Sequence, residues 1–256
     1  MTTSQVCDEC GATITVDDER AFGAAFLDHA RAEHADWQQF PDVAVVNYGE
    51  ALLRLTGRRE RLDQIGSIEI EHVTSERVDD FLAFFDTDAF VGNPAWAACY
   101  CTEPHDEPKG GPLSPPTPWR ERRTRMIELF GSGMVHGYLA YVDGRPAGWV
   151  NASTRSSCAL YRNGPGASPA DDEVAAISCF VIAPPYRRHG LADALLTRAL
   201  SDAPSRGLSW IEAYPPTETR DSDAGNFRGP KVLYERHGFE AAGEDGINTV
   251  MRKAVT

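Results

Sequence analysis

The amino-acid sequence predicts an α/β fold with a small metal-binding module in front of it. An apolar run from Val174 to Ile182 indicates a strand buried on both faces of a sheet. Apolar residues on one helical face follow it from Leu191 to Leu200, and so predict a helix. Two cysteines and two histidines near the N-terminus predict the module. We therefore expect a zinc-finger-like module over residues 1–40, a helical connector over 41–66 and the α/β domain over 67–256.

The module is expected to form around Cys7, Cys10, His29 and His34. The two cysteines lie on a tight turn, and both histidines fall on a helix predicted from Asp18 to Ala35. Two thiolates and two imidazoles complete a tetrahedral zinc site. The 18 residues between Cys10 and His29 exceed the usual finger spacing and leave room for a longer hairpin. A metal-free helical extension is the alternative, but so short a segment has little core without a structural zinc ion.

The charge of the module argues against nucleic acid as its partner. Residues 1–36 carry eight acidic and two basic side chains. A phosphate backbone would be repelled by this excess of negative charge. We therefore expect a structural element or a protein-contact element, and no nucleic-acid partner.

The connector and the first elements of the domain follow from short amphipathic patterns. Residues 48–55 predict one helix of the connector. Alternating apolar and polar residues from Ser67 to Val73 predict a first strand. Ser75 to Phe85 predicts a helix, with Ser75 as its N-cap.

The next segment contains candidate pocket residues. Cys99, Cys101 and His105 are three candidate metal ligands, and we favour a role in packing or in lining a pocket over a second metal site. A Pro/Gly-rich stretch from Lys109 to Pro118 predicts a loop. The helix expected from Trp119 to Phe130 carries four arginines, which indicate a solvated face or, alternatively, contact with an anionic ligand.

The rest of the domain alternates strands and helices. Residues 137–142 and 147–153 predict a hairpin joined at Asp143-Gly144. Trp210 to Tyr214 predicts a further strand, and the next helix is expected to begin near Gly229-Pro230.

The turn from Arg187 to Ala192 has the properties of a phosphate-binding site. Gly190 allows the backbone to approach a ligand closely. The free N–H groups at the start of the following helix, together with the helix dipole, favour a pyrophosphate.

These residues and a later block resemble the GNAT N-acetyltransferase family. Arg187, Gly190 and Ala192 fill the three defined positions of its acyl-CoA signature, Gln/Arg-x-x-Gly-x-Gly/Ala. Tyr234, 44 residues after Gly190, belongs to a stretch that matches the late Leu-Tyr-x-x-x-Gly-Phe motif. The resemblance covers about Ser67 to Thr256. It implies a mixed, mostly antiparallel central sheet flanked by helices.

The resemblance also implies a reaction and its residues. An acetyl or other acyl group would pass directly from acyl-CoA to an amine of a small molecule. The residues expected to bind acetyl-CoA are Phe180, Val181, Arg187, Arg188, His189, Gly190, Leu191, Ala192 and Asp193. Tyr234 occupies the position of the general acid, with a core tyrosine as the alternative. Glu212 is a candidate base, and Glu173 and water remain its rivals.

Composition predicts a cytoplasmic protein that contacts no membrane. No apolar run has the length of a membrane span, the first residues lack the features of a signal peptide, and the six cysteines suit thiols or metal ligands. A net charge of −13 favours cationic acceptors such as amines. Two alternatives stay open, an acyltransferase that uses aminoacyl-tRNA as donor and a non-catalytic protein that binds CoA or a partner. The resemblance also leaves room for a homodimer.

Overall fold

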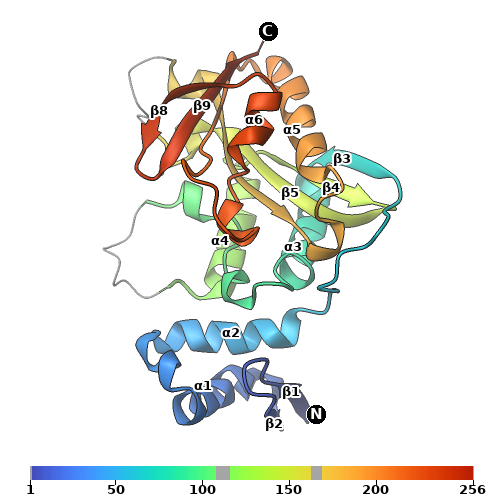
Figure 1. Cartoon of the computed structure of the whole chain (residues 1–256), viewed down its shortest axis with the longest axis vertical. Helices are drawn as coiled ribbons and strands as arrows, with labels where there is room; N and C mark the ends of the chain where they lie inside the picture. The colour runs from blue at the N-terminus through green and yellow to red at the C-terminus, as the bar shows by residue number, and fades with distance from the viewer. Residues whose placement is uncertain (1, 108–115, 163–168, 256) are drawn as a thin grey trace.

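The computed structural model describes residues 2–107, 116–162 and 169–255. Figure 1 shows a small N-terminal unit attached to a larger body that is built around a twisted sheet. The strands are β1 (Thr3–Val6), β2 (Thr13–Val16), β3 (Ile68–His72), β4 (Gly137–Val142), β5 (Arg145–Thr154), β6 (Val174–Ile182), β7 (Trp210–Ala213), β8 (Glu240–Asp245) and β9 (Asn248–Ala254). The α-helices are α1 (Phe22–Glu33), α2 (Asp42–Arg54), α3 (Val78–Thr87), α4 (Trp119–Gly131), α5 (Leu191–Asp202) and α6 (Lys231–Arg236).

The central sheet is mixed and mostly antiparallel, which confirms the predicted fold class. Its seven strands lie in the order β3-β4-β5-β6-β7-β9-β8. Only β6 and β7 run parallel, and their pairing covers just Val174–Ile177 and Trp210–Ala213. The second half of β6, from Ser178 onward, therefore has β5 on one side and no strand partner on the other. This divergence leaves one edge of β6 without a neighbouring strand in the middle of the body.

Helices cover both faces of the sheet. On one face α5 and α6 contribute Leu195 and Leu233 to a core that includes Ile177 of β6. On the other face α3 and α4 contribute Phe81 and Met126 to a second core cluster. The apolar run of β6 is explained by this arrangement, because its side chains enter both cores.

The N-terminal unit is a hairpin, β1 and β2, followed by α1 and α2. The expected connector helix begins at Asp42, earlier than residue 48, and packs along α1. Phe26 and Gly49 are in such close contact that a Cβ on Gly49 would lie 2.6 Å from the Cβ of Phe26. The cluster around Phe26 includes Val45 and Leu52, so the packed unit extends beyond residue 40 to the end of α2. In Figure 1, α2 lies between α1 and the body.

Most predicted elements are present, with shifted ends. The turn at Asp143-Gly144 has positive φ at both residues, as a tight hairpin requires. The helix expected from Ser75 begins as a 3-10 turn, and α3 starts at Val78. Most of the loop expected between Lys109 and Pro118 lies outside the described residues. Within the part of the chain that is described, no helix combines the length and the apolar character needed to cross a membrane.

Candidate functional site

The turn between β6 and α5 has the geometry expected of a phosphate-binding loop. Gly190 is the N-cap of α5 and has φ +84°, in the left-handed region that glycine adopts without steric cost. Arg188 also has positive φ, at +66°. A Cβ at Gly190 would meet no atom within 4 Å, so the backbone here is open to a ligand. The free N–H groups of α5, a helix of twelve residues, begin at this opening.

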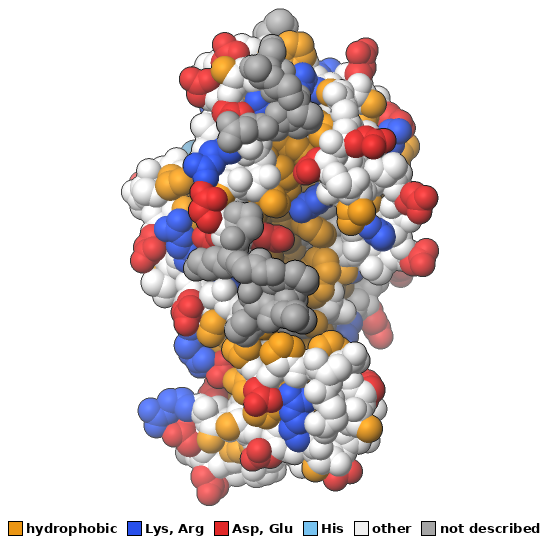
Figure 2. Space-filling model, turned by 90° about the vertical axis from the view of Figure 1, so that its left-hand side faces the viewer, with side chains coloured by type: hydrophobic (Ala, Val, Ile, Leu, Met, Phe, Trp, Pro, Cys, Tyr) orange, Lys and Arg blue, Asp and Glu red, His pale blue; other side chains and the backbone are white. Residues whose placement is uncertain are grey.

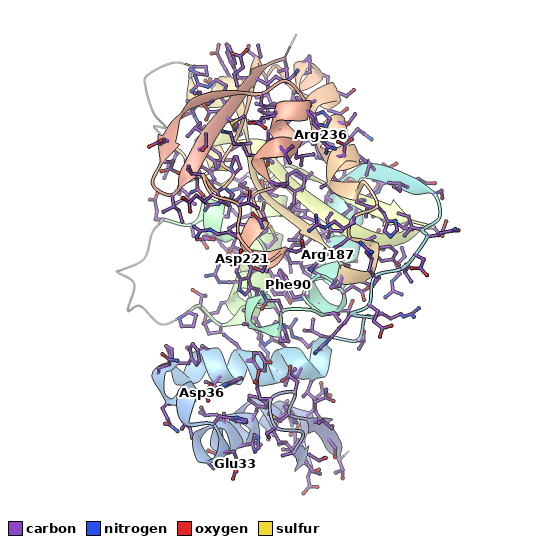
Figure 3. The ribbon with its side chains drawn as sticks, viewed as in Figure 1. Glu33, Asp36, Phe90, Arg187, Asp221 and Arg236 are labelled. Atoms are coloured by element: carbon purple, nitrogen blue, oxygen red, sulfur yellow. The ribbon has the colours of Figure 1, made fainter. Side chains whose placement is uncertain are left out.

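The turn opens into a cavity of about 830 Å³. This volume lies in the range of small-molecule sites. Eight of the nine predicted cofactor-binding residues line it, and His189 does not. The His189 imidazole instead donates through Nε2 to the carbonyl of Leu62, at 2.8 Å, and so ties the turn to the segment before β3. In Figure 3, Phe90, Arg187 and Asp221 come from three separate segments around this cavity, below Arg236 of α6.

The two arginines of the turn already have a carboxylate partner. Asp223 lies 3.5 Å from Nη1 of Arg187 and 2.6 Å from Nη2 of Arg188. Arg187 also donates through Nε to the carbonyl of Ile182, at 3.0 Å, which fixes its side chain beside β6. A pyrophosphate at this turn would compete with Asp223 for both guanidinium groups.

The unpaired edge of β6 is occupied by a short segment, Phe227–Gly229. The N–H of Phe180 donates to the carbonyl of Phe227 at 2.5 Å. The hydroxyl of Tyr234 donates to the next carbonyl, that of Arg228, also at 2.5 Å. Gly229 leaves room for this hydroxyl, since a Cβ there would lie 2.8 Å from the Tyr234 Oη. The Phe227–Gly229 segment thus accepts hydrogen bonds from the Phe180 N–H, which is expected to bind the cofactor, and from the Tyr234 hydroxyl, which is expected to act as the acid.

Tyr234 is fully buried, and in this arrangement it does not line the cavity. Burial raises the pKa of its hydroxyl well above the usual value. The hydroxyl therefore keeps its proton at neutral pH, as a general acid must. It faces the carbonyl of Arg228, which separates it from the cavity in this arrangement.

Glu212 lies on β7 in a buried ion-pair cluster and does not line the cavity. Its carboxylate accepts hydrogen bonds from Arg155 at 2.9 Å, Arg252 at 2.7 Å and Tyr214 at 2.9 Å. Its side chain is completely inaccessible to solvent. These three donors already occupy the carboxylate, so it is not placed to take a proton from a substrate in the cavity. The rival, Glu173, is exposed and also lies away from the cavity wall.

The cavity is also lined by residues that are not among the predicted site residues, including Trp96, Glu103, Arg122 and Phe227. The rings of Trp96 and Phe227 are in edge contact, with centroids 5.4 Å apart. Figure 2 shows hydrophobic side chains gathered in a hollow of the surface, with charged side chains along its rim. Arg122 has a signal in the sequence, because it belongs to the arginine-rich helix α4.

Cys101 and His105 form part of a buried polar cluster. The side-chain amide of Asn151 donates to Cys101 Sγ at 3.5 Å and lies 3.0 Å from His105 Nε2. His105 Nδ1 lies 3.0 Å from the carbonyl of Ser157. Burial lowers the pKa of His105, so its imidazole is neutral. These contacts are those of packing residues, whereas Cys99 faces the cavity.

The four predicted zinc ligands come together in the N-terminal unit. One ligand atom from each of Cys7, Cys10, His29 and His34 lies within 4.8 Å of the others. Cys7 Sγ is 3.5 Å from His34 Nε2, and Cys10 Sγ is 3.4 Å from His29 Nε2. A tetrahedral zinc ion with ordinary bond lengths separates a sulfur and a nitrogen ligand by about 3.6 Å. The donor set therefore fits zinc in both type and spacing.

Comparisons with known proteins identify the family of this chain. The profile of the Acetyltransferase (GNAT) family matches residues 98–239. No curated protein is similar enough in sequence to count as a match.

Similar solved structures are acetyltransferases. PaiA N-acetyltransferase from Thermoplasma acidophilum, in complex with coenzyme A, is 14% identical over 73% of this chain and 99% of its own, with a TM-score of 0.44. An N-acetyltransferase from Staphylococcus aureus Mu50 is 14% identical over 75% and 100%, with a TM-score of 0.46. The GNAT domain of PAT from S. lividans is 14% identical over 74% and 92%, with a TM-score of 0.46. Because the family profile spans more than half of the residues, the chain belongs to the GNAT acetyltransferase family, whose reaction is acyl transfer from coenzyme A.

Proposed function

We propose that this protein is an N-acetyltransferase that moves an acetyl group from acetyl-CoA to the amine of a small molecule. The main support for the proposal is that two backbone features line the same cavity. The left-handed Gly190 turn at the start of α5 and the unpaired edge of β6 both lie on its wall. The turn suits the phosphates of CoA, and the edge of β6 suits its pantetheine arm. The rest of the cavity is left for an acceptor.

In this proposal the pyrophosphate lies at the turn and the pantetheine arm along β6. The backbone N–H groups from Arg188 to Asp193 receive the phosphates, and Arg187 and Arg188 exchange Asp223 for them. Phe180 and Val181 supply backbone groups for the arm. Because the N–H of Phe180 now donates to Phe227, the Phe227–Gly229 segment moves when the cofactor enters.

The same movement prepares the chemistry. When the segment leaves, Tyr234 loses its acceptor at Arg228 and can donate its proton to the departing thiolate. Glu103 replaces Glu212 as the proposed base, because its carboxylate lines the cavity near Cys179 of β6. As the C–N bond forms and the C–S bond breaks, Glu103 accepts the proton lost by the nitrogen, and Tyr234 protonates the sulfur.

The pairing of the arginines on α4 speaks against aminoacyl-tRNA as the donor. Arg120 pairs with Glu50, Arg123 with Asp86 and Arg125 with Asp106. These three arginines are neutralised within the protein and do not form a cationic surface for phosphates.

Two measurements test the proposal. Calorimetry with acetyl-CoA should show binding to one site per chain, and release of free CoA should be detected when small amines are added. Absence of acetyl-CoA binding would contradict the proposal that acetyl-CoA is the donor. Binding without turnover on any amine would mean that the protein binds CoA but is not an N-acetyltransferase.

We also propose that Cys7, Cys10, His29 and His34 hold one structural zinc ion. Metal analysis of protein purified without chelators should find close to one zinc per chain. Cys10→Ser should lose it, whereas Cys99→Ser, a cysteine outside the N-terminal unit, should keep it. Protein that contains no zinc under these conditions would rule the site out.

A further inference from the structure

Four charged residues on the cavity wall form no ion pair with any described residue: Glu103, Arg122, Arg220 and Asp221. Glu103 lies in a 3-10 turn and Arg122 on α4, and both line the cavity. Among the described residues, none forms an ion pair or hydrogen bond with the carboxylate of Glu103. The cavity arginines at 187, 188 and 236 pair with Asp223 and Asp193, whereas Arg220 and Asp221 are consecutive residues of one loop. Glu103 and Arg122 are therefore available to a ligand.

Arg122 is held in place by a neutral contact that leaves its charge uncompensated. Its Nη1 donates to the hydroxyl of Thr102 at 3.0 Å, and Thr102 is fully buried. Because Thr102 precedes Glu103 in the chain, this hydrogen bond also keeps the guanidinium close to the backbone of Glu103. The two charged groups nevertheless do not come within the 4.0 Å of an ion pair.

The Cys99 thiol shows that both charges act on the same part of the cavity. Cys99 lines the wall, and burial raises its pKa to about 12. The charge of Arg122 opposes that rise and the charge of Glu103 adds to it. A cation and an anion thus flank one point of the wall.

The surface beside this point is apolar and aromatic. Phe90, Trp96 and Phe227 line it together with Ala95 and Ala98. The edge contact between Trp96 and Phe227 gives a flat hydrophobic side to the cavity. A ligand here needs one cationic group, one anionic group and an apolar body.

We propose that the acceptor is an α-amino acid with an apolar or aromatic side chain. Its amine lies at Glu103, its carboxylate pairs with Arg122, and its side chain packs against Trp96 and Phe227. The planar guanidinium suits bidentate pairing with a carboxylate. A zwitterion neutralises the charges of Glu103 and Arg122 at once, whereas a simple amine gives Arg122 no counterion. This inference rests on the proposed function and specifies its acceptor.

Matched pairs of acceptors test it. Phenylalanine and tryptophan are compared with phenethylamine and tryptamine, which lack only the carboxylate, and CoA release is followed at fixed acetyl-CoA. Wild-type protein should have the higher kcat/KM for the amino acids. In Arg122→Gln the ratio of kcat/KM for phenylalanine to that for phenethylamine should fall about 10–100-fold, as expected for a lost hydrogen bond to a charged group.

Arg125→Gln is the matched control, since Arg125 lies on the same helix, pairs with Asp106 and does not line the cavity. It should keep the wild-type ratio. Glu103→Gln should lower turnover with both kinds of acceptor. If Asp221→Asn does so and Glu103→Gln does not, the amine lies elsewhere and the inference fails. Turnover on phenethylamine without a preference for phenylalanine overturns this inference alone, whereas no turnover on any amine removes the proposed function as well.

Discussion

The guanidinium carbon of Arg54 lies 4.1 Å from the centre of the Trp119 ring. This contact joins α2 of the N-terminal unit to the first residue of α4 in the body. Glu50, one helical turn earlier on α2, accepts hydrogen bonds from the Trp119 indole and from Arg120. The second helix of the N-terminal unit therefore holds the start of the helix that carries Arg122.

We expect Glu50→Ala to lower the free energy of unfolding by about 1–3 kcal/mol, because the Trp119 indole loses its acceptor and Arg120 loses its partner. Chemical denaturation measures this change. The control is Glu33→Ala on α1, an exposed residue labelled in Figure 3, which should change stability by less than about 0.5 kcal/mol. Equal effects in the two variants would mean that the contact adds no stability.

Gly190→Glu should abolish acetyl-CoA binding, because a carboxylate at the start of α5 repels the pyrophosphate and fills the approach to the backbone. Gly207→Glu is its matched control. Gly207 has a similar φ of +74° and equally open surroundings, and it does not line the cavity. Both variants carry the same backbone strain. A difference between them in calorimetry with acetyl-CoA therefore reports the effect of a carboxylate at the start of α5. Retained affinity in Gly190→Glu would place the phosphates elsewhere.

Tyr234→Phe keeps the ring and removes the hydroxyl. If Tyr234 protonates the thiolate, kcat should fall by about 10²–10⁴-fold with little change in acetyl-CoA affinity. If its role is only the hydrogen bond to Arg228, stability should fall by about 1 kcal/mol while turnover persists. Steady-state kinetics paired with a melting curve separates the two results.

Stability should fall as pH is lowered from about 6.5 towards 3, with His136 as one cause. Burial, followed by the charges of Arg206 and His72, lowers the pKa of His136 to about 3. The unfolded chain then binds a proton that the folded protein excludes, and the difference grows as pH falls below 6.5. Denaturation across this range should show a smaller pH dependence in His136→Gln. An identical slope in that variant would show that His136 titrates normally.

The features that the sequence predicts well are those with a local physical cause. The apolar composition of β6 follows from its burial on both faces, and Gly190 has a conformation that few other residues adopt. The spacing of Cys7, Cys10, His29 and His34 is set by one turn and one helix, so the clustering of these four side chains could be predicted without coordinates.

The features that it does not predict depend on distant contacts. From the alternation along β7 alone, Glu212 could lie on either face of the sheet. Its face is decided by Arg155 and Arg252, which bind its carboxylate. Glu103 lies in an irregular segment, where no periodicity indicates what a side chain faces. The strand β8 was missed because its residues are mostly exposed and show no apolar alternation.

The hydrogen bond from Phe180 to Phe227 makes part of the chain a competitor of the cofactor. In the proposed binding mode, acetyl-CoA displaces the Phe227 carbonyl. Its measured affinity is then the intrinsic affinity multiplied by the fraction of molecules in which this hydrogen bond is open. The Phe227 ring is at the same time one side of the apolar wall beside Trp96. Cofactor entry therefore reshapes the place where the acceptor packs. Each substrate should change the dissociation constant of the other, and linkage requires the two factors to be equal.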